Sequence, residues 1–470
     1  MKFFLDTIAR VSSKSKLAVM KFEFGFEKKD DSEVGSFETQ RSKREWHKEA
    51  WLTVIGSSLV YFSTFGIINS FGFFQEYYKN HNLASTPAST ISFIGTLQIT
   101  LMNLLAAPAG SLFDCYGLKV ISHFQILNFF SLRPHEYDVN ISQHLYIFSA
   151  IGCSGGLLAL SFSHPETLWQ PFLIQGVLLG IAIAFGSQPA LVVAGQHFAR
   201  HRALVMGIVA ASGSVGGVCF PIIFAKLMPQ IGFAWTLRVV AAVIGVCYVI
   251  AFFISWTKMP TRPLQLQALF DFKGFADSRY FVLAIGAFLA MLGQFVPYYY
   301  MSSYCVVANP TSKAKDYLLP LMNASSILGR MVGGLVADET GPTNIVYPMT
   351  ILSGVQCLGM WLVTSEVGVL VAFVILYGFC SGVFIAVLPV IVAQISPEEK
   401  LGGRIGALYT VLAIAQLVGS PIGGVLIRQK SDFAYGFAGL IGFGGTTLLG
   451  GGIVIFISRF LQDRNLKSKY

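Results

Sequence analysis

Long apolar runs recur along the whole chain and limit what it can fold into. Crossing the hydrocarbon core of a bilayer as a helix takes about 20 mostly apolar residues. Runs of that kind centre on twelve segments: 51–74, 89–112, 145–163, 170–196, 203–227, 236–256, 279–304, 316–337, 345–364, 367–391, 405–427 and 434–458. Only helices and closed barrels satisfy the backbone in lipid, and these runs lack the alternation of barrel strands. The sequence therefore predicts an all-α polytopic membrane protein with twelve transmembrane helices.

The composition excludes several other classes of protein. The chain is 54% hydrophobic and 12% charged, whereas a soluble domain carries roughly 25% charged residues. A soluble enzyme, a disordered regulator and a fibrous protein are therefore excluded. The net charge of +9 does not indicate nucleic-acid binding, because most basic residues are scattered between the apolar runs. The seven Cys residues show no CxxC spacing, so we expect packing residues without disulfides or a metal.

The distribution of basic residues predicts the orientation. The first fifty residues mix eleven basic and nine acidic side chains, and their start is too weakly apolar for a signal peptide. If both termini are cytosolic, 24 Lys and Arg residues lie on that side of the membrane and seven on the other. This agrees with the positive-inside rule.

The spans divide into two halves around a basic loop. We expect a cytosolic tail over 1–50, a six-helix bundle over 51–256, a central cytosolic loop over 257–278, a second six-helix bundle over 279–458 and a cytosolic tail over 459–470.

A short motif occurs once in each half, after the second and the eighth span. The pattern Gly-x3-Asp-x2-Gly is formed by Gly110, Asp114 and Gly117, with Lys119 close behind, and again by Gly334, Asp338 and Gly341. Repeated halves are a hallmark of secondary transporters, and we expect these loops to act in gating. The alternative for each copy is an ordinary turn that contains an Asp and a Gly.

The stretch 120–143 fits this plan poorly. It starts with an apolar run too short to cross the membrane and continues into a polar segment. Deleting it would reduce the separation of the two motifs from 224 to 200 residues. We interpret it as a retained intron or gene-model artefact, with an interfacial helix as the alternative.

A resemblance to a known family emerges around the fifth span. The stretch Gln196–Gly213, read QHFARHRALVMGIVAASG, is similar to the fifth-span signature of the monocarboxylate porter family, especially its fungal members, within the major facilitator superfamily. Residues 214–221 continue the match, and Gly232–Arg238 resembles the family's beginning of the sixth span. The first-span signature is reduced to Glu49-Ala50-Trp51. The resemblance covers roughly 46–460 and implies the major facilitator fold, two pseudo-symmetric six-helix bundles that work by alternating access.

The chain departs from its animal proton-coupled relatives at two positions. Those relatives place a Lys in the first span and an Asp one turn before an Arg in the eighth. This chain has Asn69 and Ser326 there, and only Arg330 matches. The proton and substrate chemistry of those relatives therefore does not transfer as a whole.

Arg330 is the leading candidate for a substrate ligand. An Arg within a span costs about 2.5–3.5 kcal/mol on insertion scales, which makes it a functional candidate by default. Asn323, Ser326 and Arg330 share one face of the predicted helix, and a guanidinium can grip a carboxylate with two hydrogen bonds. The alternative is an Arg that snorkels to the cytosolic interface or pairs with Asp338.

Polar residues of other spans are weaker candidates. In the superfamily that the chain resembles, the spans that hold these residues line the cavity, so we expect substrate contacts from Asn69, Gln98, Gln294, Tyr298 and Tyr409. For each one, helix packing is the alternative, and the run Tyr298–Tyr300 is also compatible with an interfacial aromatic belt. Arg200 and Arg202 are expected to anchor a short cytosolic loop, with gating as a secondary role.

These features together predict a secondary transporter. We expect it to move a small organic acid or weakly acidic metabolite, with efflux of a secondary metabolite as one form of that activity. Neither a P-loop nor an HExxH motif occurs, and no cofactor, metal or catalytic residue is expected. Protons are the candidate coupling ion, the plasma membrane the expected location and a monomer the expected state. The alternatives are a non-transporting nutrient sensor of transporter-like fold and, less favoured, a membrane enzyme.

Overall fold

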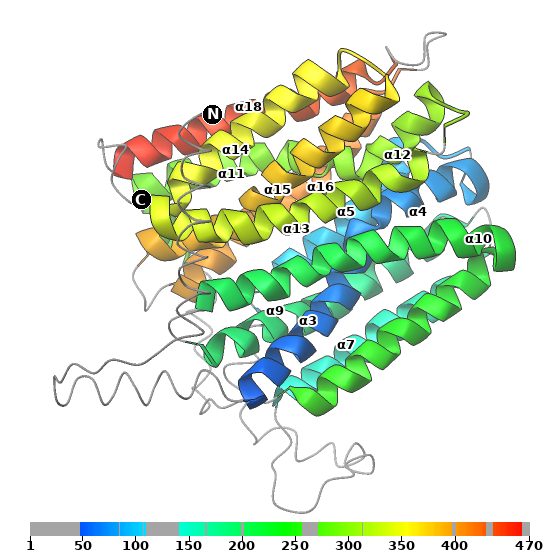
Figure 1. The fold of residues 1–470 in the computed structure, drawn as a ribbon, viewed down its shortest axis with the longest axis horizontal. Helices are drawn as coiled ribbons and strands as arrows, with labels where there is room; N and C mark the ends of the chain where they lie inside the picture. Colours follow the sequence, from blue (N-terminus) through cyan, green and yellow to red (C-terminus); the bar gives the residue numbers. More distant parts are fainter. Residues whose placement is uncertain are drawn as a thin grey trace, which may run out of the picture. The chain divides into compact units, whose positions relative to one another are not determined.

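The structure is a computed structural model (Figure 1). It describes residues 48–83, 85–106, 108–109, 141–164, 167–198, 202–255, 271–312, 314–396, 401–428 and 436–462. Every regular element in these ranges is a helix.

The described residues of the first half form nine helical elements, several of which join end to end. They are α3 (Lys48–Asn69), α4 (Phe71–Tyr77), η1 (Tyr78–Asn82), α5 (Ala88–Leu104), α7 (Ile141–Leu160), α8 (Trp169–Pro171), η4 (Phe172–Leu178), α9 (Leu179–Gln196) and α10 (Arg202–Ile254). Helix α10 holds the predicted fifth and sixth spans, which meet at Gly232 with a φ of 78°. Glycine tolerates that left-handed conformation, and Figure 1 shows α10 doubling back on itself there.

The second half follows the same plan. Its elements are η6 (Phe272–Ala276), α11 (Ser278–Gln294), α12 (Val296–Ala308), α13 (Lys315–Thr340), α14 (Pro342–Gln356), η7 (Cys357–Trp361), α15 (Val367–Ile395), α16 (Leu401–Val425) and α18 (Ala438–Gln462). The predicted seventh span is broken between α11 and α12, where Pro297 stands in the first turn of α12. Proline offers no N–H to continue the ladder of the preceding helix.

Seven helical stretches of the described chain are long and apolar enough to cross a bilayer. They are Lys48–His81, Trp169–Ala194, Val205–Ile254, Ser278–Ala308, Val367–Ile395, Gly403–Val425 and Ala438–Leu461. Because Val205–Ile254 folds into two arms, these stretches account for eight predicted spans. The other four coincide with α5, α7, α13 and the pair α14 and η7. The expectation of an all-α fold with twelve spans is confirmed.

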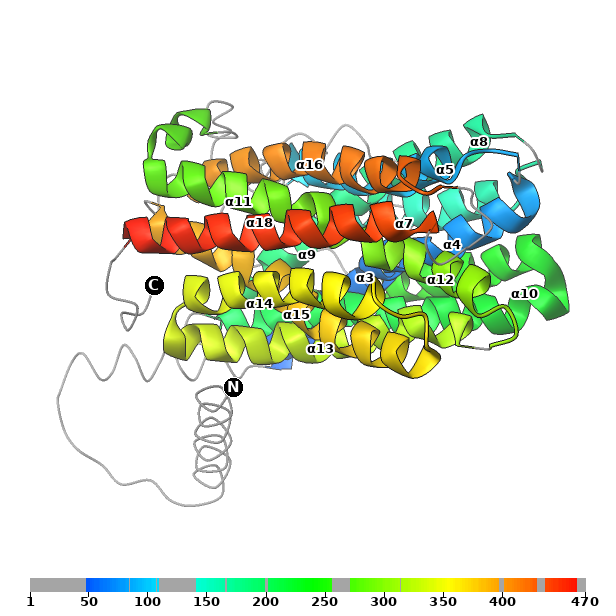
Figure 2. The same cartoon turned by 90° about the horizontal axis from the view of Figure 1, so that it is seen from above.

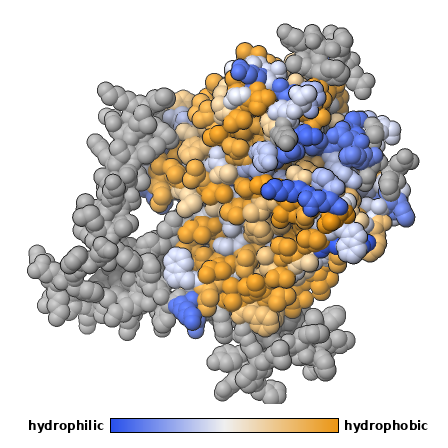
Figure 3. Space-filling view, turned by 45° about the vertical axis from the view of Figure 1, so that its right-hand side comes forward, coloured by the Kyte–Doolittle hydropathy of each residue, from blue (hydrophilic) through white to orange (hydrophobic). Residues whose placement is uncertain are grey.

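Large apolar side chains cover the flanks of the helices. Ile151, Phe162, Val363 and Val425 are each about 70% exposed, at 68%, 68%, 72% and 71%. Figure 3 shows apolar side chains over most of the coloured face and hydrophilic ones gathered toward its right-hand part. A surface of this kind is stable in contact with lipid rather than with water.

The two ends of the spans serve as reference points. We call the end where α13 meets α14 the Gly341 end, and the end where α10 reverses the Gly232 end; they lie at the left and the right of Figure 2. Gly341 has a φ of 95°, and its N–H donates to the Ala337 carbonyl at 2.9 Å. Gly341 therefore forms the turn between α13 and α14 at the second copy of the repeat motif.

Among the described helices, three pairs make the main contacts between the two halves. Toward the Gly232 end, α4 meets α12: the rings of Phe71 and Tyr299 are 4.9 Å apart, and a Cβ on Gly72 would collide with the main-chain carbonyl of Tyr298. Elsewhere α5 meets α16, where the Thr100 hydroxyl donates to the Ala413 carbonyl at 3.2 Å. The third pair, α10 and α13, carries most of the candidate site.

Candidate substrate-binding site between the two halves

Arg330 lies on α13 and is only 4% exposed. Glycines on the far side of α13 let it pack closely against α15, because a Cβ on Gly329 would collide with the Phe379 carbonyl. On the near side, Arg330 Nη1 donates to the Ala210 carbonyl of α10 at 2.7 Å. Its Nε has no hydrogen-bond partner among the described residues. The predicted alternative of pairing with Asp338 is wrong, since Asp338 is exposed and the described partner of Arg330 is Ala210.

Asn323 and Ser326 lie on the same helix and are fully buried. The Asn323 amide donates to the carbonyls of Gly217 on α10 and Leu319 on its own helix, both at 3.1 Å. In the described part of the chain, its Oδ1 has no hydrogen-bond partner and the Ser326 hydroxyl makes no well-formed hydrogen bond, although the Tyr298 hydroxyl lies near it. Leaving a buried polar atom unpaired costs roughly 1–3 kcal/mol. Helix α13 therefore holds three buried groups that can form further hydrogen bonds: the Arg330 guanidinium through Nε, the Ser326 hydroxyl and the Asn323 Oδ1 acceptor.

Asn69 reaches this group from the first half. It lies at the end of α3, is 7% exposed, and its amide sits 3.4 Å from the Gly213 carbonyl of α10. A Cβ on Gly217 would lie 2.6 Å from Asn323 Oδ1 and 2.8 Å from Asn69 Cβ. Gly217 thus lies between the two amides, and both halves contribute polar side chains to one region.

Tyr298 and Gln294 flank the break between α11 and α12. The Tyr298 hydroxyl is 3.0 Å from the Ser381 hydroxyl of α15, and the Gln294 amide donates weakly to the Ser381 carbonyl at 3.4 Å. The helix break leaves main-chain carbonyls to be satisfied by other groups, and the Tyr377 hydroxyl donates to the Gln294 carbonyl at 2.8 Å. Because Tyr298, Tyr299 and Tyr300 are at most 4% exposed, the alternative of an interfacial aromatic belt is wrong.

Tyr61 belongs to this region although the sequence analysis did not select it. It lies on α3, stacks on Phe65 with ring centroids 4.8 Å apart, and is within electrostatic range of both Tyr409 and Arg330. Tyr61 and the predicted Tyr409 therefore lie in the wider surroundings of Arg330. The signal was the spacing of Tyr61, Phe65 and Asn69, four residues apart each time, which places them along one helix face.

Gln98 lies apart from this group in the described contacts. It is fully buried on α5, and neither atom of its amide has a partner in the described ranges. Its main-chain carbonyl approaches Gly180 of α9. Besides Thr100, the α5 residue Asn103 joins the halves, because its amide donates to Gln416 of α16. That pair depends on which helices are neighbours, and sequence spacing does not reveal it.

The expected gating residues are only partly described. Gly334 would have open space around an added Cβ, Asp338 is exposed, and Gly341 forms the turn described above. Arg202 is the first residue of α10, and its side chain is not among those described. Gly110, Asp114, Gly117, Lys119 and Arg200 lie outside the described residues. So do residues 120–140, whereas residues 141–143 form the start of α7.

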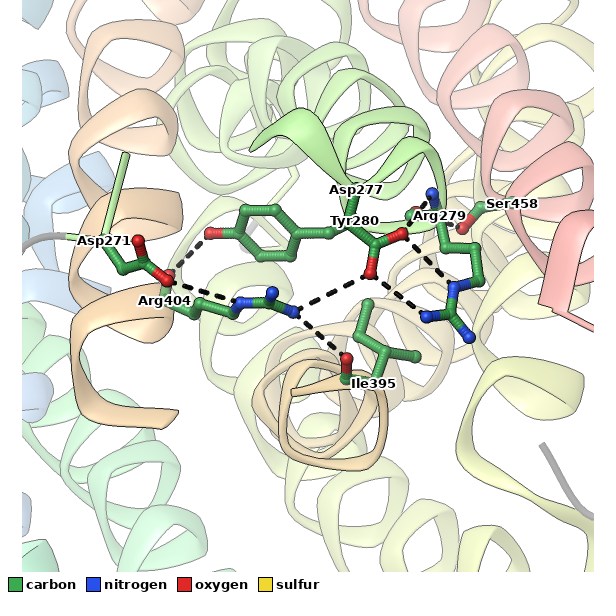
Figure 4. A network of polar contacts seen from close by, with 7 residues as sticks. All are labelled: Asp271, Asp277, Arg279, Tyr280, Ile395, Arg404 and Ser458. Atoms are coloured by element: carbon green, nitrogen blue, oxygen red, sulfur yellow. Dashed lines mark hydrogen bonds and ion pairs between the residues drawn. The ribbon is translucent and has the colours of Figure 1, made fainter. Parts of the chain in front are cut away.

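A charged network at the Gly341 end of the second half was not predicted (Figure 4). Arg404 of α16 contacts Asp271 at 3.6 Å and Asp277 at 3.9 Å, and donates to the Ile395 carbonyl at 3.1 Å. Asp277 caps α11 by accepting from the Arg279 N–H at 3.0 Å. Burial opposes ionisation of Asp277, but hydrogen bonds from Arg279 and the charges of both arginines outweigh it, so its pKa lies below the usual range. The network joins the end of the central loop to α11, α15 and α16.

Comparisons with known proteins agree with this architecture. The model of the Major Facilitator Superfamily matches residues 142–366 and 324–469. Agnestins efflux protein AgnL12 of Paecilomyces divaricatus is 32% identical over 92% of this chain and 93% of its own length. Aspyridones efflux protein apdF of Emericella nidulans is 30% identical, covering 88% of this chain and 78% of its own. MFS-type transporter 1 of Ophiocordyceps sp. is 33% identical, covering 82% and 80%.

A solved structure supports the fold independently of sequence. The nucleoside transporter NupG superposes with a TM-score of 0.61, covering 88% of this chain and 100% of that chain at 12% identity. At that identity the likeness concerns the fold alone. The relatives are named as transporters and efflux proteins, which favours a transporter over the sensor and enzyme alternatives. With the family match and the relatives above 30% identity, the chain belongs to the major facilitator superfamily of membrane transporters.

Proposed function

We propose that this transporter moves an organic acid, or a larger weakly acidic metabolite, by alternating access, with Arg330 holding the acid group. The observation that carries the proposal is a buried guanidinium whose Nε is unused, on the same helix as the unused Ser326 hydroxyl and Asn323 Oδ1. A buried charge is stable only when it is paired and hydrogen-bonded. Among the described residues, Arg330 has a carbonyl but no carboxylate as partner, so an anionic cargo would supply the missing charge.

The contacts between the halves fit a cycle in which the two bundles rock against each other. The hydrogen bonds described between α10 and α13, from Arg330 to Ala210 and from Asn323 to Gly217, end on main-chain carbonyls, and the bond from Asn103 to Gln416 joins two neutral amides. Each contributes only about 0.5–1.5 kcal/mol net, or somewhat more for a charged donor. A junction of such bonds opens without separating a fixed pair of opposite charges, which suits a transporter that alternates between two states.

Export of a fungal metabolite is the form of transport that we favour. Two of the relatives above are named as efflux proteins for agnestins and aspyridones. We place the chain in the monocarboxylate porter branch, on the fifth-span and sixth-span signatures of its sequence. Asn69 and Ser326 replace the Lys and Asp of proton-coupled relatives. This substitution supports a cargo unlike lactate or pyruvate, and favours facilitation or export.

The proposal includes an orientation and a setting. The excess of Lys and Arg on one side supports cytosolic termini, so that the Gly341 end faces the cytosol and the Gly232 end faces outward. We place the protein in the plasma membrane as a monomer. Protons are the coupling ion to test first, by measuring transport with and without a pH gradient.

Reconstitution tests the proposal directly. Purified protein in liposomes is offered radiolabelled acetate, pyruvate, benzoate and salicylate, and trapped label is compared with that of protein-free liposomes. We expect at least one aromatic acid to exchange across the membrane faster than in the protein-free control. Saturable binding of an acid without any movement of label would instead support the sensor alternative.

A further inference from the structure

A second intramembrane arginine lies far from the candidate site, on the outer flank of the first half. Arg238 follows the Gly232 turn by six residues, roughly 9 Å along the second arm of α10. Its Nε donates at 3.2 Å to the hydroxyl of Ser161, just past the end of α7. Ser161 in turn donates to the Leu158 carbonyl at 2.7 Å, which fixes the hydroxyl as an acceptor for Arg238.

Two aromatic rings hold the guanidinium in place. Arg238 Cζ lies 4.6 Å from the centre of the Phe162 ring and 4.7 Å from the centre of the Trp235 ring. Cation–π contacts at such distances are worth about 0.5–2 kcal/mol. Both rings point away from the bundle, with exposed fractions of 68% for Phe162 and 60% for Trp235. The cation therefore lies against two outward-facing rings on the flank of the protein.

The described contacts leave the charge of Arg238 unbalanced. Its contacts in the described chain are a neutral hydroxyl and two neutral rings. With Nε engaged, the two terminal amino groups remain for a ligand, and such a planar fork suits a phosphate. The surroundings are apolar and outward-facing, with Val239 39% exposed beside Trp235. A phospholipid carries its phosphate at the membrane interface, where Trp and Arg are enriched, and its acyl chains match the apolar surroundings. A phospholipid phosphate is therefore the ligand that fits this position.

We propose that Arg238, Ser161, Phe162 and Trp235 form a binding site for the phosphate of a membrane phospholipid, near the Gly232 end of the first half. The lipid phosphate accepts from the terminal amino groups of Arg238, and the acyl chains lie along the exposed apolar flank of α7 and α10. This site is separate from the cargo route and does not depend on the cargo proposed above.

Thermal unfolding of the purified protein in detergent tests the site. The protein is titrated with a short-chain phosphatidylglycerol, with the diacylglycerol of the same chains and with inorganic phosphate. We expect the phospholipid alone to raise the melting temperature, and Arg238→Gln to need about tenfold more of it, equivalent to about 1.4 kcal/mol. Equal responses of Arg238→Gln and the unmodified protein would overturn the proposal, and so would stabilisation by inorganic phosphate alone or by diacylglycerol.

Two further variants keep the test decisive if Arg238→Gln does not fold. Trp235→Leu keeps the cation but removes one of its rings, and we expect it to weaken the phospholipid response about threefold. Trp169→Leu is the matched control, since Trp169 is 63% exposed on the same half and no cation contact is described for it. A Trp169→Leu response as weak as that of Trp235→Leu would contradict the proposed site.

Discussion

Arg330 of the second half donates a 2.7 Å hydrogen bond to the Ala210 carbonyl of the first half. Arg330 is the one fully buried cation of the described α10–α13 junction. Its hydrogen bond therefore links the two six-helix halves that must move relative to each other in alternating access. An acid bound to Arg330 would compete with this carbonyl or add to it through the unused Nε. Cargo binding and the contact between the halves are thus coupled through one side chain.

Asn323 is expected to contribute to cargo affinity. Asn323→Ala removes the bond to the Gly217 carbonyl, worth about 1 kcal/mol, which positions α13 against α10 beside Arg330, and it removes an Oδ1 that could accept from a donor group of the cargo. We expect the KM for a transported acid to rise about fivefold to tenfold, measured as concentration-dependent uptake into proteoliposomes. The matched control is Ser325→Ala on the same helix, because the Ser325 hydroxyl donates to the Met322 carbonyl at 3.0 Å and faces α15. Equal effects of both variants would argue for general damage to α13.

Gly72 is expected to permit closure at the Gly232 end. A Cβ there would collide with the Tyr298 carbonyl, and main chain cannot move aside as a flexible side chain can. We expect Gly72→Ala to slow transport about tenfold or more while leaving binding of the acid nearly unchanged. Gly450→Ala on α18 is the control, since open space surrounds an added Cβ at that position. Normal transport by Gly72→Ala would mean that α4 and α12 need not approach so closely.

The network around Arg404 is expected to stabilise the second half in a pH-dependent manner. The pKa of Asp277 is lower in the folded protein than in the unfolded chain, so its charged form stabilises the fold above the ordinary range near 3.9. That contribution is lost as the pH falls through the lowered folded pKa. Asp277→Asn should lower the melting temperature by about 1–3 °C at pH 7, and the difference from the unmodified protein should shrink below about pH 4. Glu366→Gln, at an exposed carboxylate of the second half, should show no such difference; a difference between Asp277→Asn and the unmodified protein that persists unchanged at low pH would contradict the account.

The spans and one face of the site could be predicted because both are local properties of the sequence. A span needs only a long apolar run, and the spacing of Asn323, Ser326 and Arg330 fixes their shared face through the helical repeat. The break after Gln294 also has a local cause, because Pro297 lies in the first turn of α12. These predictions required no knowledge of which helices are neighbours.

The remaining contacts depend on the packing of distant helices. The bond between Asn103 and Gln416 joins residues 313 apart in sequence. Tyr61 belongs to the candidate site only because the fold brings α3 near Arg330. Gln98 shows the converse, since its polarity and depth in a span suggested a ligand although its described neighbours lie on α9. Arg404 likewise meets Asp271 and Asp277 only after the ends of α11, α15 and α16 come together.

Discrimination between an acid and its neutral amide tests the central claim most directly. The measurement compares inhibition of labelled benzoate exchange by unlabelled benzoate and by benzamide, in liposomes that contain the unmodified protein, Arg330→Lys or Arg330→Gln. A hydrogen-bonded pair of charges in a buried site is worth about 2–5 kcal/mol. We therefore predict that the unmodified protein prefers benzoate by about 30-fold or more, that Arg330→Lys keeps part of this preference, and that Arg330→Gln loses it. An undiminished preference for benzoate in Arg330→Gln would contradict the account, because the acid group would then be recognised elsewhere.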